Sequence, residues 1–206
     1  MQKLVPLLLV LSVQCVYSVS LQEDLLDLEL NVPKEKISQL FVQYIIQDVQ
    51  FRHSIRYVRS DEFSDTWNQF LELAKVHQLL LYMQNAGLPI DKVLHMFAGF
   101  TGIQPPSTKF KRSLIKRGGL NAFIEDVVQV VAQSDVKTMT EEKKRLSSQF
   151  LEMTEKLNSD EYKRLFTEAF DDPDVIILQQ ELQTYDIELP KLLELMKAFF
   201  GWSAFF

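Results

Sequence analysis

Apolar residues recur along this chain every three to four positions, the spacing that places them on one face of an α-helix. The pattern is clearest over residues 37–45, 51–58, 63–71 and 76–83. Residues that favour helix starts or ends separate these stretches: Pro33, Asp48, Ser60, Ala74, Gly87, Pro89 and Gly102. The sequence therefore predicts an all-α fold. Asp24–Leu30 intersperses acids with leucines, a pattern compatible with either a helix or a strand.

A helix-start stretch occurs twice in the chain. Ser60-Asp61-Glu62 matches Ser159-Asp160-Glu161 at an offset of 99 residues. Other caps and apolar positions match at the same offset, without a gap from Leu21/Leu120 to Gly102/Gly201: Asp27/Asp126, Asp48/Ser147, Phe51/Phe150, Trp67/Phe166 and Leu79/Leu178. We therefore predict two tandem copies of a roughly six-helix unit, at residues 19–102 and 121–206, that together form one globular unit. Because Asp186-Ile187-Glu188 replaces Gly87-Leu88-Pro89 in the second copy, we expect that turn to differ.

The N-terminus has the features of a secretory signal peptide. Lys3 precedes an apolar run from Leu4 to Val13, and Val16-Tyr17-Ser18 offers small residues before a cleavage site, so we assign residues 1–18 to a signal. The alternative is an N-terminal membrane anchor, which the shortness of the run disfavours. Cleavage would remove the single cysteine, Cys15, and leave a secreted chain that packing alone holds together.

Residues 103–120 are predicted to form a basic linker that contains Pro and Gly. It includes Lys109-Phe110-Lys111-Arg112 and Lys116-Arg117. Cleavage by a trypsin-like protease, contact with an anionic membrane and a plain solvated connector all fit this composition. The whole chain carries a net charge of −6. Nucleic acid is therefore not an expected partner, because duplex binding needs Lys and Arg to neutralise phosphates.

The sequence offers little for catalysis. It lacks the usual nucleophile, zinc-protease and phosphate-loop motifs, and His53, His77 and His95 have no metal-site spacing. The second copy repeats none of these histidines, so a structural role suits them better. Acidic pairs such as Asp160-Glu161 are explained as first-turn residues of helices. We therefore expect no enzyme activity, no metal and no cofactor.

The last helix of each unit is apolar on most faces, which places it in a core or along an apolar space. The pattern does not separate a solid core from a cavity for apolar ligands, because both use the same residue types. If a cavity exists, we expect both units to line it through Ile45, Phe51, Ile55, Phe63, Trp67, Leu79, Met83, Val93, Phe97, Phe100, Phe150, Phe166, Leu178, Leu182, Leu192, Met196 and Phe199.

Three segments carry a family likeness: Gly118–Asp126, the Ser60–Phe63 helix start, and Gly87–Asp91 before a Leu/Phe-rich helix. Together they resemble the insect allergen related repeat family. That family includes the group-one cockroach allergens, mosquito midgut microvillar proteins and the nitrile-specifier proteins of butterfly larvae. The resemblance covers essentially the whole chain after the signal, although Val19-Ser20-Leu21 replaces the Gly-Gly leader in the first unit.

The resemblance implies a helical protein secreted in the gut, whose two repeats surround a large hydrophobic cavity for fatty acids or phospholipids. We therefore expect a lipid-binding monomer in the midgut lumen or at the microvillar surface. The alternative is a membrane-active protein that lyses cells or viral membranes by lipid exchange, which the aromatic tail Trp202–Phe206 and the basic linker also suggest. A nitrile-specifier-like detoxification role is a third reading, for which the sequence supplies no nucleophile.

Overall fold

The computed structural model describes residues 20–94 and 118–200, and within these ranges every regular element is a helix. The first half contains α2 (Leu21–Asn31), α3 (Lys34–Gln47), α4 (Val49–Val58), α5 (Asp61–Glu72) and α6 (Ala74–Asn85). The second half contains α8 (Gly119–Ala132), α9 (Val136–Leu146), α10 (Ser148–Leu157), α11 (Asp160–Phe170), α12 (Pro173–Gln183) and α13 (Leu189–Phe200). A further helical segment begins at Ile90 and reaches Leu94, where the first described range ends. The signal segment with Cys15, residues 103–117 of the linker and the aromatic tail lie outside the described residues.

Helix starts recur at the 99-residue offset. Asp48 and Ser147 cap α4 and α10 by accepting a hydrogen bond from the backbone N–H three residues later, at 3.0 and 3.2 Å. Ser60 and Ser159 do the same for α5 and α11, both at 3.1 Å. These side chains pair N–H groups that a helix start leaves without a partner. The four starting points are therefore fixed by local chemistry.

The ambiguous N-terminal stretch is a helix, α2. Ser20 Oγ accepts from the Glu23 N–H at 3.3 Å, and the Glu23 carboxylate accepts from the Ser20 N–H at 2.9 Å. This reciprocal pair is a capping box, which starts the helix immediately after Ser20. The corresponding helix of the second half, α8, begins at Gly119, slightly inside the segment predicted as the linker.

The turn before the last helix is alike in both halves, so the expectation that it would differ was wrong. Gly87 has a φ of 110° and Asp186 a φ of 59°, and both values lie in the left-handed region. In each turn the following residue donates its N–H back to the preceding helix, at 3.1 Å from Leu88 and 3.0 Å from Ile187. Asp tolerates left-handed backbone better than most residues with a side chain, so the turn keeps its form without glycine.

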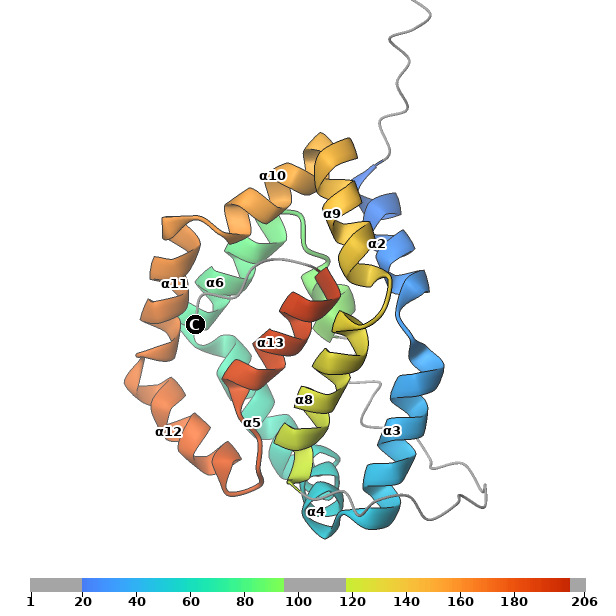
Figure 1. Ribbon diagram of the computed structural model, residues 1–206. Coiled ribbons are helices and arrows are strands. Elements are labelled where there is room, and N and C mark those ends of the chain that lie inside the picture. The colour runs from blue at the N-terminus through green and yellow to red at the C-terminus, as the bar shows by residue number, and fades with distance from the viewer. Residues whose placement is uncertain (1–19, 95–117, 201–206) are drawn as a thin grey trace, which may run out of the picture.

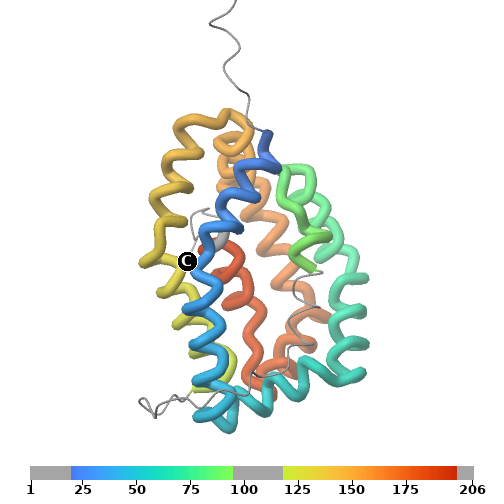
Figure 2. The backbone as a smooth tube through the Cα atoms, turned by 90° about the vertical axis from the view of Figure 1, so that its right-hand side faces the viewer, coloured from blue at the N-terminus to red at the C-terminus, as the bar shows by residue number. Residues whose placement is uncertain are grey.

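The two halves are interleaved. Helix α8 packs against α3 and α4 of the first half, whereas α2 packs against α9 and α10 of the second. Helix α6 contacts α11 in the same exchanged manner, and α5 contacts α12. Figures 1 and 2 show the helices arranged around α13, which lies among the others. Each half therefore packs against helices of the other half as well as against its own.

An aromatic cluster fills the space between α3, α4 and α8. The Phe51 ring is fully buried, and its centroid lies 5.5 Å from Phe41, 5.2 Å from Tyr44 and 5.0 Å from Phe123. Aromatic side chains bury large apolar areas and prefer such tilted and edge-on contacts. Because Phe123 belongs to the second half, the cluster stabilises the contact between the halves.

Backbone groups at two helix starts also join the halves. The buried Asp48 carboxylate caps α4 with Oδ1, and its Oδ2 accepts from the Gly119 N–H at 3.0 Å. At the other end of the molecule, Gln149 Oε1 on α10 accepts from the Leu21 N–H at 2.9 Å. Each half thus holds the first helix of the other half in place.

Candidate functional site

The predicted lining residues divide into two groups by burial. Buried candidates take part in helix–helix packing: Phe51, Ile55, Phe63, Leu79, Met83, Phe150, Leu178 and Leu182. Half-buried candidates keep some apolar surface accessible: Ile45, Trp67, Val93, Phe166, Leu192 and Met196. Phe97, Phe100 and the side chain of Phe199 lie outside the described residues. The half-buried group is the part of the prediction that a ligand could cover.

Helix α13 carries incompletely buried apolar side chains although it lies among other helices (Figure 1). Leu192, Leu195 and Met196 pack against the core, yet all three remain partly exposed. Leucine in a solid core is usually buried almost completely. The central helix therefore differs from the fully packed contact between α3, α4 and α8.

Half-buried aromatic side chains occupy equivalent positions on α5 and α11. On α5, the Trp67 ring lies 6.0 Å from Phe63 and 5.3 Å from Phe70. On α11, the Phe166 ring stacks on Phe170 at 4.3 Å. Trp67 and Phe166 are 99 residues apart, so both halves present an aromatic face of similar character.

Two polar groups within this apolar region were missed by the sequence interpretation. Tyr162 is 2% exposed, and its hydroxyl oxygen has no hydrogen-bond partner among the described residues. Burial raises the pKa of this phenol to about 12. Lys197 on α13 is 5% exposed, and its Nζ donates to Glu194 Oε1 at 3.0 Å. Lys197 is one of three charged residues on α13, with Lys191 and Glu194, so the sequence alone did not distinguish it as buried.

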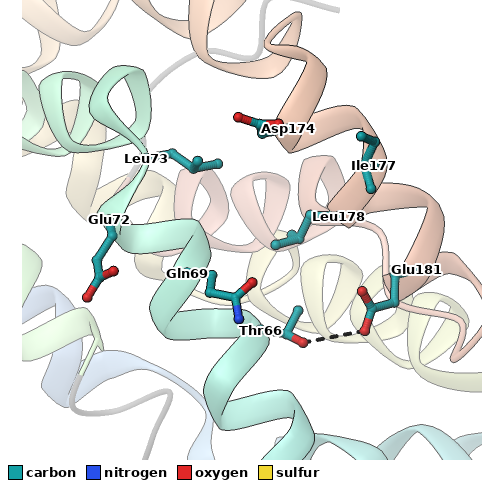
Figure 3. Close-up of a pocket in the computed structure, with 8 residues that line it drawn as sticks. All are labelled: Thr66, Gln69, Glu72, Leu73, Asp174, Ile177, Leu178 and Glu181. Carbon is teal, nitrogen blue, oxygen red and sulfur yellow. Dashed lines mark hydrogen bonds between the residues drawn. The ribbon is translucent and has the colours of Figure 1, made fainter.

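A pocket of about 420 Å³ lies between α5 and α12 (Figure 3). Its walls come from Thr66, Gln69, Glu72 and Leu73 on one side and from Asp174, Ile177, Leu178 and Glu181 on the other. Of these residues, only Leu178 was a predicted lining residue. The polar lining residues were not predicted, because polar residues on a helix face have the pattern of ordinary solvated surface.

At one end of this pocket two neutral groups donate hydrogen bonds to Glu181, and an ion pair lies next to the other end. Glu181 Oε1 accepts from the Tyr57 hydroxyl at 3.3 Å and from Thr66 Oγ1 at 3.4 Å. Burial raises the pKa of the Tyr57 phenol; Thr66 opposes this rise and Glu181 adds to it. Beyond the other end, Lys75 Nζ lies 3.0 Å from Asp172 Oδ2, and this partner lowers the pKa of Asp172.

A second, apolar pocket has a volume of only about 40 Å³. Two predicted lining residues, Ile55 and Leu192, contribute to it, together with Val58, Leu120, Phe123, Ile124 and Ile187. This space corresponds to about one water molecule, whereas an acyl chain needs far more. The large shared cavity therefore stays a prediction.

The two histidines in the described part of the chain, His53 and His77, belong to no candidate metal site. His53 is exposed and its ring stacks on Tyr185 at 5.5 Å, His77 is exposed on α6, and His95 lies outside the described residues. Within residues 20–94 and 118–200, no three His, Cys, Asp or Glu side chains are placed to hold a metal ion.

Comparison with known sequences agrees with the motifs at the helix starts and turns. Residues 20–193 match the family described as insect allergen related repeat, nitrile-specifier detoxification. This chain belongs to the insect allergen related repeat family. It is also 29% identical over 175 residues to Protein G12 of Anopheles gambiae, in an alignment that covers 84% of this chain and 83% of that relative. The family match spans both halves and ends within α13, and none of the described helices is long and apolar enough to cross a bilayer.

Proposed function

We propose that this member of the insect allergen related repeat family is a secreted lipid-binding protein. In this proposal, two copies of one helical unit enclose an apolar space that holds fatty acids or the acyl chains of phospholipids. The protein acts as a monomer without enzymatic activity, in the midgut lumen or at the microvillar surface. The signal-like N-terminus and the insect relative support this location.

The observation that carries the proposal is the incomplete burial of apolar side chains around α13. Leu192 and Met196 on α13, Trp67 on α5 and Phe166 on α11 all keep accessible surface although they pack against the core. Covering apolar surface contributes about 25 cal/mol per Å², so an acyl chain of many methylenes gains several kcal/mol from such contacts.

Equivalence of the halves supports the two-copy architecture. α4 and α5 begin at Val49 and Asp61, and α10 and α11 begin at Ser148 and Asp160, each 99 residues later. The interleaved packing places the central helix between elements of both halves. A space enclosed in this way would be lined by equivalent residues of both copies.

Lipid extraction tests the proposal directly. We expect the purified chain to release fatty acids or phospholipids into organic solvent, and the delipidated protein to take up a fluorescent fatty acid. Phe166→Trp places at this position the residue that its counterpart Trp67 already provides, so the fold should accept it while space for ligand shrinks. The variant should lose affinity for long chains by about fivefold or more, whereas Leu146→Lys, at a residue 70% exposed, should bind as the wild type does. An empty extract together with no uptake would exclude lipid binding.

The alternative of a membrane-active protein is tested with the same preparations. Dye release from liposomes should be compared between loaded and delipidated protein, since lysis by lipid exchange requires the two states to differ. Leakage in neither state would exclude this alternative and leave lipid storage or transport.

A detoxification role is the second candidate, because nitrile-specifier detoxification forms part of the description of the matched family. It predicts nitrile formation when the chain is added to a plant toxin undergoing hydrolysis. Loss of that product in His77→Ala would favour this role, whereas an unchanged product pattern with and without the protein would exclude it.

A further inference from the structure

The pocket between α5 and α12 forms where the two halves differ. Its counterpart in the exchanged packing is the contact between α6 and α11, which is more extensive. There, the Tyr82 hydroxyl is hydrogen-bonded to Ser159 Oγ at 2.9 Å and to the Lys156 carbonyl at 3.1 Å, so side chains fill this contact. At the position equivalent to Tyr82, the second half has Glu181, and a pocket of about 420 Å³ remains open beside it. This volume lies within the roughly 300–1,000 Å³ of small-molecule sites.

One wall of the pocket is a row of side chains on α5 and the other is a row on α12, and the two helices run in opposite directions. Thr66 donates a hydrogen bond to Glu181 at one end of the pocket, and Leu73 after the end of α5 lies toward Asp174 at the start of α12 (Figure 3). Figure 3 shows Asp174 and Glu181 at opposite ends of the α12 row, with Leu178 between them. The two acids are seven positions apart on α12, which corresponds to about 10 Å along the helix. The pocket therefore has one acidic group at each end of the α12 wall, with Leu178 and Gln69 between them.

The charges of this pocket favour a cation. Its lining includes three carboxylates and no Lys or Arg. Glu72 and Glu181 lie in the last turns of α5 and α12, where the helix dipole favours positive charge, and neither last turn contains a basic residue. The described carboxylates are not grouped closely enough to bind one metal ion. A ligand with separated positive groups matches this layout better than a single ion does.

We propose that the α5–α12 pocket binds an aliphatic diamine in its doubly protonated form. One ammonium group lies at Glu181 and the other at Asp174. The methylene chain between them covers Leu178 and the exposed side chain of Ile177. Fatty acids and other anions are excluded, because the carboxylates at both ends repel them. This site is separate from the apolar space around α13.

Calorimetric titration of the delipidated chain with hexanediamine, hexylamine and hexanoate tests the proposal. We expect hexanediamine to bind at least about tenfold more tightly than hexylamine, because both ends of the pocket are used, and hexanoate not to bind. Asp174→Asn and Glu181→Gln should each weaken hexanediamine binding about threefold to tenfold. Binding should also weaken as salt is raised, because exposed charges are screened.

Controls come from an acid outside the pocket lining and from lipid loading. Asp171→Asn changes the acid equivalent to Glu72 at the α6–α11 contact and should leave diamine binding unchanged. Loading the protein with a fatty acid should also leave it unchanged, so the test is independent of the lipid proposal. Equal affinity for hexanediamine and hexylamine, equal effects of Asp171→Asn and Asp174→Asn, or displacement of the diamine by fatty acid would each overturn the assignment.

Discussion

The phenol of Tyr44 donates a hydrogen bond to Asp126 Oδ2 at 2.9 Å, and this bond joins α3 of the first half to α8 of the second. At the positions 99 residues away, Lys143 on α9 pairs with Asp27 on α2, also at 2.9 Å. These two contacts are equivalent under the 99-residue offset and both join the halves. One uses a neutral donor and the other is an ion pair. The aspartate is kept at both positions, whereas its donor has changed.

Tyr44→Phe removes the neutral link and should destabilise the fold moderately. Tyr44 is 2% exposed, and its ring would remain packed against Phe51 and Phe123 in the variant. We expect the free energy of unfolding to fall by about 1–2 kcal/mol, the cost of leaving the half-buried Asp126 carboxylate without one donor. Urea unfolding followed by circular dichroism measures this loss. Tyr185→Phe, at a half-buried tyrosine, is the control and should change stability by a few tenths of that amount.

Lys143→Met should cost more, because the lysine also serves a buried carboxylate. Its Nζ lies 2.9 Å from Asp24 Oδ1, and Asp24 is only 3% exposed. The other oxygen, Asp24 Oδ2, has no partner among the described residues. Removing the ammonium leaves a buried charge, for which we expect a loss of about 3 kcal/mol or more in urea unfolding. Asp24→Asn in the Lys143→Met background should recover part of this loss, and no recovery would contradict the argument.

The helices and many of their boundaries could be predicted from the sequence, because helix starts and ends depend on nearby residues. Ser60 and Ser159 cap their helices within three residues, and Gly87 ends α6 through its own backbone. The turn at Asp186 was predicted wrongly, since a left-handed aspartate leaves no glycine to recognise. The exchange of helices between halves could not be predicted either, because an apolar face does not specify which helix will cover it.

The candidate site was less predictable than the fold, for a related reason. Phe51 and Trp67 have the same kind of position on their helices, yet Phe51 is fully buried and Trp67 is half-buried. Only the relative placement of the helices separates a packed position from one that faces open space. The pocket residues Thr66 and Glu181 lie far apart in the sequence, so their proximity depends on the contact between α5 and α12.

Asp48 should contribute two separable hydrogen bonds to stability. Asp48→Ser keeps the cap on α4, as Ser147 does on α10, but cannot also reach the Gly119 N–H. We expect Asp48→Ser to lower the free energy of unfolding by about 1–2 kcal/mol and Asp48→Ala by about 2–4 kcal/mol. Ser147→Ala, which removes a cap alone, should cost about 1 kcal/mol. If Asp48→Ser and Asp48→Ala lost the same amount in urea unfolding, the cap would contribute nothing.

Tyr162→Phe should change the alkaline stability of the fold. Burial raises the pKa of the Tyr162 phenol to about 12, whereas an exposed tyrosine in the unfolded chain titrates near roughly 10. The pKa of this phenol is higher in the folded chain than in the unfolded chain. Below about pH 10 the phenol is neutral in both states, so its contribution to the free energy of unfolding is fully present there. This contribution is lost as the pH rises from about 10 to 12, because the phenol then ionises in the unfolded chain while it is still neutral in the folded chain. The variant has no group to ionise here, so its free energy of unfolding should fall less steeply above pH 10.

At neutral pH the same variant should be as stable as the wild type or more stable by up to about 1 kcal/mol. The hydroxyl oxygen is buried without a partner among the described residues, so its removal ends a desolvation cost. Phe63 already occupies the equivalent position of the first half, which shows that the local packing accepts the smaller ring. Urea unfolding of both proteins between pH 7 and about 11.5 would measure the two effects together, with Tyr185→Phe as the control. Parallel stability curves for wild type and Tyr162→Phe across that range would show that this phenol ionises equally in the folded and unfolded chains. A loss of several kcal/mol in the free energy of unfolding at neutral pH would show that the Tyr162 hydroxyl has a partner that stabilises the fold.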